Sequence, residues 1–151
     1  MHLNPDLIDL LRALNGEGAE YLIVGGYAFA VHGRARATKD IDIFVGTDAA
    51  NAQKVWHALA AFGAPLQDLT VEDLTVPQTF FIMGRAPNQI DIITTIDDVC
   101  FERAWKNRVT STYGGVSVNY IGRDDLIANK TAADRLQDRA DVAYLREHED
   151  E

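Results

Sequence analysis

The feature of this sequence that most restricts its fold is a pair of short apolar runs separated by two glycines and a basic segment. Residues 21–26, "YLIVGG", are four apolar residues followed by two glycines, and residues 41–45, "IDIFV", alternate in the direction of their side chains. Short apolar runs bounded by turn-forming residues are typical of buried β-strands. The two runs therefore predict two strands, with a short helix at residues 27–33 and a basic loop between them.

Two segments on either side of these runs have the spacing of amphipathic helices. Asn4 is the predicted N-cap of the first, Pro5 its first residue, and Gly16 follows its predicted end. Residues 48–62 follow the same period and stop at Gly63. Both segments are expected to cover the sheet with their apolar sides.

The second half of the chain contains two predicted hairpins. Residues 79–84 and 89–96 read as strands, and the link at residues 85–88 is short enough to join them directly. Gly114-Gly115 can supply the positive φ values of a tight turn in the second hairpin. The other predicted elements are a loop at 63–77 with one helical turn started by Thr70, a helix at 98–106, and a helix from Asp124 to about Glu147, broken near Gln137.

This order of elements predicts an α/β fold with a short mixed β-sheet, flanking helices and a helical C-terminal part. The 151 residues are 47% hydrophobic and 25% charged, which suits one domain over residues 1–151. No apolar run approaches the roughly 20 residues of a transmembrane helix, so we expect a cytoplasmic protein without a membrane partner. The single cysteine, Cys100, excludes an intrachain disulfide, and we interpret it as a buried packing residue.

Three aspartates are the candidates for chemistry. Asp40 and Asp42 are two residues apart on a predicted strand, so both carboxylates leave the same face, with Cα atoms about 6.5 Å apart. Asp91 is a lone acid in the apolar strand at 89–96, where burial is costly unless a cation pairs with it. Carboxylates that converge in this way bind hard divalent cations, which can clamp an in-line phosphoryl or nucleotidyl displacement.

The two glycines complete the constellation. Gly25 and Gly26 stand at a strand end before a helix, where a phosphate can approach the backbone and meet unpaired N–H groups. Taken alone, each part has a simpler interpretation: the glycines as a tight turn, and the acids as solvated or ion-paired strand residues. The combination, in this order, favours a metal site.

The arrangement of Gly-Gly, thirteen residues, Asp-x-Asp and a later strand aspartate resembles the polymerase-beta-like nucleotidyltransferase superfamily. The segments "GRAPNQIDIITTIDDVCFERAW" and "DDLIANKTAADRLQDRADVAYL" also look like small bacterial nucleotidyltransferases related to abortive-infection toxins. Together the similar segments run from about residue 21 to residue 146. Many superfamily members have Gly-Ser where this chain has Gly25-Gly26, so one side-chain contact to phosphate is absent.

The resemblance implies roles for individual residues. Gly25 and Gly26 would hold the nucleotide phosphates, and Asp40, Asp42 and Asp91 would bind Mg²⁺ or Mn²⁺. Asp91 would also accept the proton of the attacking hydroxyl. Lys130 matches a lysine that lies near the triphosphate or the reacting centre in the toxin-like relatives.

Charged residues outside this constellation have two interpretations each. The cluster of Arg34, Arg36 and Lys39 precedes the two strand acids, so it is either a phosphate-binding loop or a solvated one. Lys130 either extends from the edge of an apolar stripe toward the three acids or pairs with Asp134 on the helix surface. The expected stripe is Leu126, Ile127, Ala133 and Leu136; Asp138 and Asp141 are expected to be solvated or paired with Arg135 and Arg139.

The predicted function is metal-dependent transfer of an NMP from an NTP to a hydroxyl, with release of pyrophosphate. The net charge of −9 opposes a broad nucleic-acid-binding surface but allows one triphosphate or one RNA end to bind locally. The resemblance suggests that the acceptor is tRNA or a protein. It also suggests that the chain is a toxin whose partner is a cognate antitoxin. The alternative is a binding module with this fold that does not catalyse, such as an antitoxin-like partner. The sequence does not indicate the oligomeric state.

Overall fold

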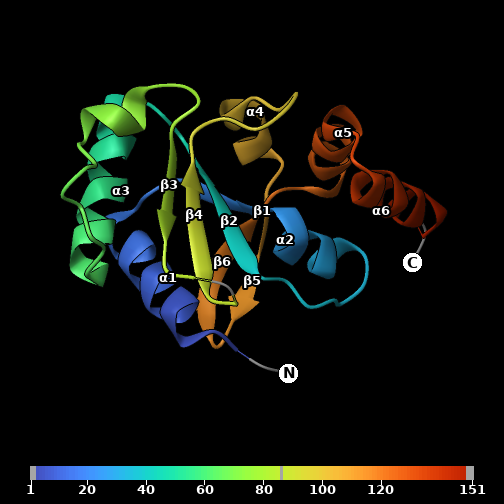
Figure 1. The fold of residues 1–151 in the computed structure, drawn as a ribbon, viewed down its shortest axis with the longest axis horizontal. Coiled ribbons are helices and arrows are strands. Elements are labelled where there is room, and N and C mark those ends of the chain that lie inside the picture. Colours follow the sequence, from blue (N-terminus) through green and yellow to red (C-terminus); the bar gives the residue numbers. More distant parts are fainter. Residues whose placement is uncertain (1–2, 86, 149–151) are drawn as a thin grey trace.

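In a computed structural model, which describes residues 3–85 and 87–148, the chain forms a six-stranded mixed sheet with helices on both faces (Figure 1). The strand order is β3-β4-β2-β1-β6-β5, so β2 and β1 lie at the centre. The strands are β1 (Tyr21–Val24), β2 (Asp40–Val45), β3 (Phe80–Met83), β4 (Gln89–Ile93), β5 (Val109–Tyr113) and β6 (Val116–Tyr120).

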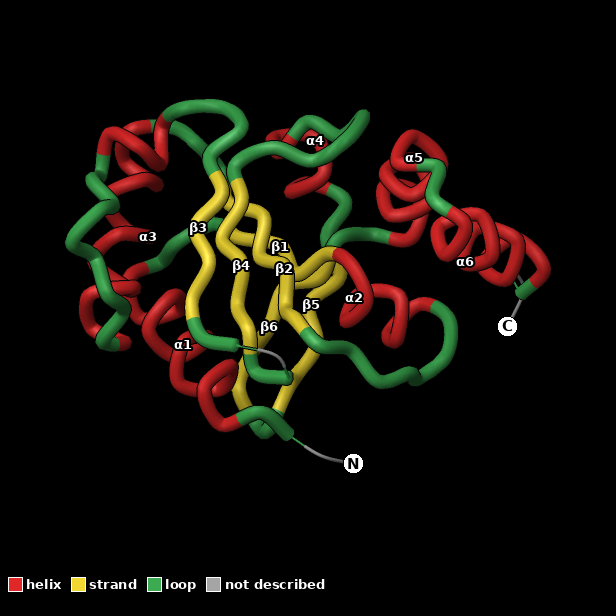
Figure 2. Tube along the Cα trace, in the orientation of Figure 1, coloured by secondary structure: helices red, strands yellow, loops and turns green. Residues whose placement is uncertain are grey.

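The helices divide between the two faces of the sheet. They are α1 (Pro5–Glu17), α2 (Gly25–His32), α3 (Ala49–Phe62), the 3-10 turn η1 (Glu72–Thr75), α4 (Phe101–Lys106), α5 (Arg123–Ala133) and α6 (Leu136–Glu147). Asn15 of α1 accepts a hydrogen bond from the Tyr21 hydroxyl, which fixes α1 to one face of β1. Phe101 of α4 packs edge to face on Phe44, whose side chain leaves the other face. In Figure 2, α1 and α3 lie on one side of the molecule and α5 and α6 on the other.

The strand pairing explains how polar residues come to lie in a buried sheet. β2 pairs antiparallel with β1 and parallel with β4. Along β2, Ile41 and Ile43 are buried, whereas Asp40 and Asp42, which alternate with them, are only partly buried. Alternation of side chains thus puts the isoleucines in the core and both acids on the opposite face.

The predicted α/β fold with a mixed sheet, flanking helices and C-terminal helices is confirmed. Both predicted hairpins form, β3–β4 and β5–β6, the second around Gly114 and Gly115 with φ values of 57° and 81°. Residue 86, in the link of the first hairpin, lies outside the described residues. The turn that Thr70 was expected to start is η1, where Thr70 and Asp73 cap each other.

One predicted helix end is wrong, and one helix break falls slightly earlier than predicted. Helix α1 continues through Gly16 to Glu17, and its C-cap residue Gly18 has a φ of 70°, the left-handed conformation that stops a helix. The break predicted near Gln137 falls at Asp134 and Arg135, with Asp134 at φ 56°. This earlier break turns Leu136 out of the expected apolar stripe, and its exposed fraction is 85%.

The interpretation of Cys100 as a buried residue is also wrong. Cys100 occupies the N-cap position of α4 and is exposed, with its thiol donating to the Glu102 carboxylate at 3.0 Å. The apolar letters around it belong to the start of α4, where Phe101 takes the inward position. Among the described residues, no helix is long and apolar enough to cross a bilayer.

Candidate metal and nucleotide site

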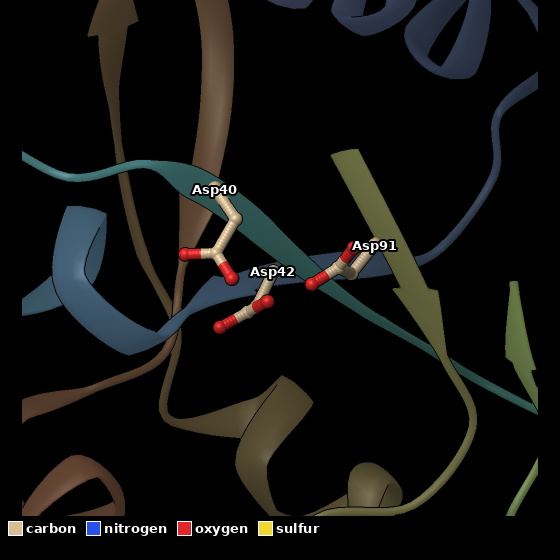
Figure 3. A group of neighbouring side chains, drawn as sticks. All are labelled: Asp40, Asp42 and Asp91. Carbon is tan, nitrogen blue, oxygen red and sulfur yellow. The ribbon is translucent and has the colours of Figure 1, made fainter. Parts of the chain in front are cut away.

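The pairing of β2 with β4 brings Asp40, Asp42 and Asp91 together. Asp42 and Asp91 are direct partners across the parallel ladder, and Asp40 precedes them on the same face. Each residue offers a carboxylate oxygen, and these oxygens all lie within 4.8 Å of one another. Figure 3 shows the three carboxyl groups turned toward each other. We call this group the acid triad.

The acid triad holds more negative charge than its surroundings compensate. Burial, followed by the adjacent Asp91 and Asp40 carboxylates, raises the pKa of Asp42 to about 7. Burial and the Asp91 charge also raise the pKa of Asp40. Among the described residues, no lysine or arginine forms an ion pair with any of the three, and Asp91 receives a hydrogen bond from the neutral Gln89 amide at 2.8 Å.

This set of donors fits a divalent metal ion. Three carboxylates offer hard oxygen ligands, and a bound cation would supply the missing counter-charge. The partial exposure of Asp40 and Asp42 leaves a side of the acid triad open for further ligands such as phosphate oxygens.

The first of the two glycines, Gly25, lies directly against the acid triad. A Cβ atom on Gly25 would come 2.5 Å from Asp42 Oδ2, and Gly25 has a φ of 66°, so both space and backbone conformation favour glycine. Gly25 begins α2, whose N-cap residue Val24 makes no side-chain hydrogen bond to the helix. The first turn of α2 therefore presents uncapped N–H groups next to the carboxylates, as an anion site requires.

The structure gives a reason for glycine rather than serine at position 26. A Cβ atom there would lie 2.5 Å from the Thr38 methyl carbon. Thr38 thus occupies the space that a serine side chain would need.

The basic loop between α2 and β2 is tied to the C-terminal helix. Arg36 donates to the Asp141 carboxylate at 2.6 Å, and its guanidinium carbon lies 4.5 Å from the centre of the Phe29 ring. Arg34 lies over the Tyr144 ring at 4.8 Å. Lys39 is exposed. The three predicted phosphate-binding residues therefore differ: two are held against neighbouring side chains, and one extends into solvent.

Lys130 makes different contacts from both of those expected. The residue is 5% exposed, and its ammonium lies 2.8 Å from Asp141 Oδ2 and 3.4 Å from Asp138 Oδ1. The surface ion pair with Asp134 is wrong, because Asp134 binds Arg139 at 2.7 Å instead. The reason is the break after Ala133, which folds α6 back over α5 and brings two acids of α6 onto the lysine.

Asp138 and Asp141 are buried, with exposed fractions of 1% and 2%, so they are not solvated. The predicted pair of Asp138 with Arg135 is confirmed, whereas Asp141 pairs with Arg36 and Lys130 and not with Arg139. Burial alone would raise the pKa of Asp138, but hydrogen bonds from Arg135 and the charge of Lys130 outweigh it and hold that pKa below its ordinary value. The pKa of Asp141 is likewise lowered, by hydrogen bonds from Arg36 and Lys130 that outweigh burial. We call Lys130, Asp138 and Asp141 the buried ion cluster.

One residue near the acid triad was not a sequence candidate. The positive charge of Arg135 counteracts the raised pKa values of both Asp40 and Asp42, although 93 residues separate it from Asp42 along the chain. Its sequence neighbours suggested only a surface pair on a helix. The sequence around Arg135 does not show that its guanidinium comes within electrostatic range of the acid triad. Only the tertiary structure reveals this position.

Comparison with known proteins gives one family. A family model described as "Nucleotidyltransferase of unknown function (DUF6036)" matches residues 6–146, most of the chain. The matched region includes the acid triad, both glycines and the buried ion cluster. No curated protein matches the sequence.

Proposed function

The chain belongs to the DUF6036 family of nucleotidyltransferases of unknown function, and from this premise we propose that it transfers an NMP from an NTP to an acceptor hydroxyl with the help of Mg²⁺ or Mn²⁺. The observation that carries the proposal is the convergence of three carboxylate oxygens within 4.8 Å without an ion-pairing cation. A bound divalent ion would neutralise the triad and polarise the α-phosphate. The order Gly-Gly, Asp-x-Asp and strand aspartate further supports membership of the polymerase-beta-like superfamily.

In this proposal each part of the site has a defined task. Gly25 and Gly26 hold phosphate oxygens through backbone N–H groups at the start of α2. Asp40, Asp42 and Asp91 hold the metal, and Asp91 accepts the proton of the acceptor hydroxyl. The acceptor oxygen forms a bond to the α-phosphorus, the bond from that phosphorus to the bridging oxygen breaks, and pyrophosphate leaves. Arg34, Arg36 and Lys39 add positive potential around the phosphates. Lys130 supports the site indirectly, because it fixes the carboxylates that bind Arg36 and Arg135.

A direct test uses purified protein, each of the four α-labelled NTPs, Mg²⁺, and either total RNA or a nuclease-treated protein extract. We expect label to move from one NTP to material that resists desalting, and pyrophosphate to appear in equal amount. An Asp42→Asn variant should give no transfer. NTP binding by the wild type that is equally tight with and without Mg²⁺ would contradict the proposal.

The acceptor and the biological setting are part of the same proposal. The resemblance to abortive-infection toxins favours tRNA or a protein as acceptor and a cognate antitoxin as partner. Induced expression of the wild-type chain should then slow bacterial growth, whereas the Asp42→Asn variant should not, and an adjacent reading frame should restore growth. Binding of NTP and Mg²⁺ without transfer to any acceptor would instead support the non-catalytic binding module.

A further inference from the structure

The guanidinium of Arg135 is exposed to solvent but is bound by the buried carboxylate of Asp138. Arg135 is the N-cap residue of α6, and its side chain is 79% exposed. Its Nε donates to Asp138 Oδ2 at 2.7 Å, and its Nη2 to Asp138 Oδ1 at 3.4 Å. Asp138 is itself fixed from within by Lys130. The Asp138 carboxylate holds one edge of the guanidinium, while Nη1 has no hydrogen-bond acceptor among the described residues.

The same guanidinium acts electrostatically on the acid triad without touching it. Its charge opposes the raised pKa values of Asp40 and Asp42, and the Asp42 charge in turn contributes to a raised pKa of Arg135. No ion pair joins Arg135 to the acid triad in the described part of the chain. Arg135 is therefore within electrostatic range of the triad, and its Nη1 donor has no partner among residues 3–85 and 87–148.

A second arginine is held in a matching way by the other acid of the buried ion cluster. Arg36 binds Asp141, and its Nη2 lies 3.8 Å from the position that a Cβ atom on Gly26 would take. Lys130 contacts both Asp138 and Asp141, so one buried ammonium fixes the carboxylates that hold both arginines. One guanidinium is thus placed beside the phosphate-binding turn and the other near the metal ligands.

We propose that Arg135 contacts the β- and γ-phosphates of the bound NTP and stabilises the departing pyrophosphate, with Asp138 as its positioning residue. This inference rests on the proposed function. If the α-phosphate lies over the acid triad, the phosphates beyond it carry charge that the triad repels. A planar guanidinium fixed along one edge is well suited to bind such phosphate oxygens with its remaining N–H groups.

The test measures binding, so that it requires no acceptor. The probes are the α,β-methylene analogues of the four ribonucleoside triphosphates, which stand in for the NTPs but cannot release pyrophosphate, and the four monophosphates. Calorimetry with Mg²⁺ would compare the wild type with Arg135→Ala, Arg135→Lys and Arg139→Ala. Arg139 is a matched control because it is an exposed arginine on the same helix that also binds a carboxylate, Asp134. Arg135→Ala should fold, because Asp138 keeps Lys130 as its partner.

We expect Arg135→Ala to weaken binding of the triphosphate analogue roughly tenfold or more and to leave monophosphate binding unchanged. Arg135→Lys should recover part of the loss, and Arg139→Ala should match the wild type. If the wild type, Arg135→Ala and Arg139→Ala all bound the triphosphate analogue equally tightly, the role of Arg135 would be overturned and the proposed function would stand. An equal loss for monophosphate and triphosphate would overturn that role too. Failure of the wild type to bind any triphosphate analogue in a Mg²⁺-dependent way would overturn the proposed function as well.

Discussion

Among the residues that the structure describes, two groups of aspartates lie in partly or fully buried positions, and their electrostatic surroundings are opposite. In the acid triad, Asp40 and Asp42 have raised pKa values, because burial and neighbouring carboxylates disfavour their charged forms. In the buried ion cluster, Asp138 and Asp141 expose almost no surface yet have lowered pKa values, because Arg135, Arg36 and Lys130 outweigh the cost of burial. Burial raises carboxylate pKa values in both groups, and the supply of cations decides the direction of the net shift.

The contrast indicates two different uses of the same residue type. A carboxylate whose charge is satisfied by the protein serves to hold elements together, here α5, α6 and the basic loop. A carboxylate without a nearby cation raises the free energy of the folded protein, and a bound cation can lower that free energy again.

Loss of one triad charge should abolish transfer. Asp42→Asn removes a ligand from the metal that polarises the phosphate, so we expect the transfer rate to fall about 10³-fold or more. The variant should fold as well as the wild type, because it relieves repulsion among the three acids. Asp9→Asn is a suitable control, since Asp9 is exposed on α1. Near-normal transfer by Asp42→Asn would assign the acid triad to structure.

Loss of the cluster lysine should destabilise the fold. Lys130→Met leaves two buried carboxylates short of a partner, and breaking a buried ion pair typically costs about 3–5 kcal/mol. We expect about 3 kcal/mol here, because Asp138 keeps Arg135 and Asp141 keeps Arg36. Urea denaturation would measure the free energy of unfolding. The matched variant Arg139→Met, at an exposed pair, should leave it nearly unchanged, because solvent screens that pair. If Lys130→Met and Arg139→Met lowered the free energy of unfolding equally, the buried ion cluster would have no special role in holding the fold together.

The pH dependence of stability should show the raised pKa of Asp42. Between the ordinary carboxyl pKa of 3.8 and about 7, the folded protein retains a proton that the unfolded chain releases. The free energy of unfolding of the metal-free protein should therefore fall as pH rises through this window. Denaturation curves in EDTA at pH 5, 6, 7 and 8 would measure the slope. Asp42→Asn should flatten it; an identical slope in the variant would place the raised pKa elsewhere.

Metal addition should have the smallest effect and act only on the acid triad. At pH 8, Mg²⁺ should raise the melting temperature, because it binds the folded state and neutralises the triad. For a Kd of about 1 mM, 10 mM Mg²⁺ gives about 1.4 kcal/mol, or a shift of about 3–6 °C. Asp42→Asn should lose most of this shift, whereas Arg135→Ala should keep it. A shift of the same size in both variants would point to a metal site away from the triad.

Local sequence alone determined the parts of the site that lie on single strands or turns. The alternation along residues 40–45 placed Asp40 and Asp42 on one face, and an isolated acid in an apolar strand identified Asp91. The paired glycines at the end of β1 indicated a turn with room for a close approach. These features depend on periods of a few residues, which a sequence displays directly. They also predicted the mixed sheet and the order of its elements.

Tertiary structure alone decided which distant charges meet. The register of β2 against β4 set Asp42 opposite Asp91, and the left-handed Asp134 turned α6 back so that Asp138 and Asp141 reached Lys130. The same turn exposed Leu136 and placed Arg135 near the acid triad. Ion pairing over such separations depends on where whole helices dock, whereas helical spacing reports only neighbours three or four residues apart. For that reason the sequence indicated the ligands of the candidate metal site, whereas only the folded chain showed that Arg36, Lys130 and Arg135 pair with the other group of acids, Asp138 and Asp141.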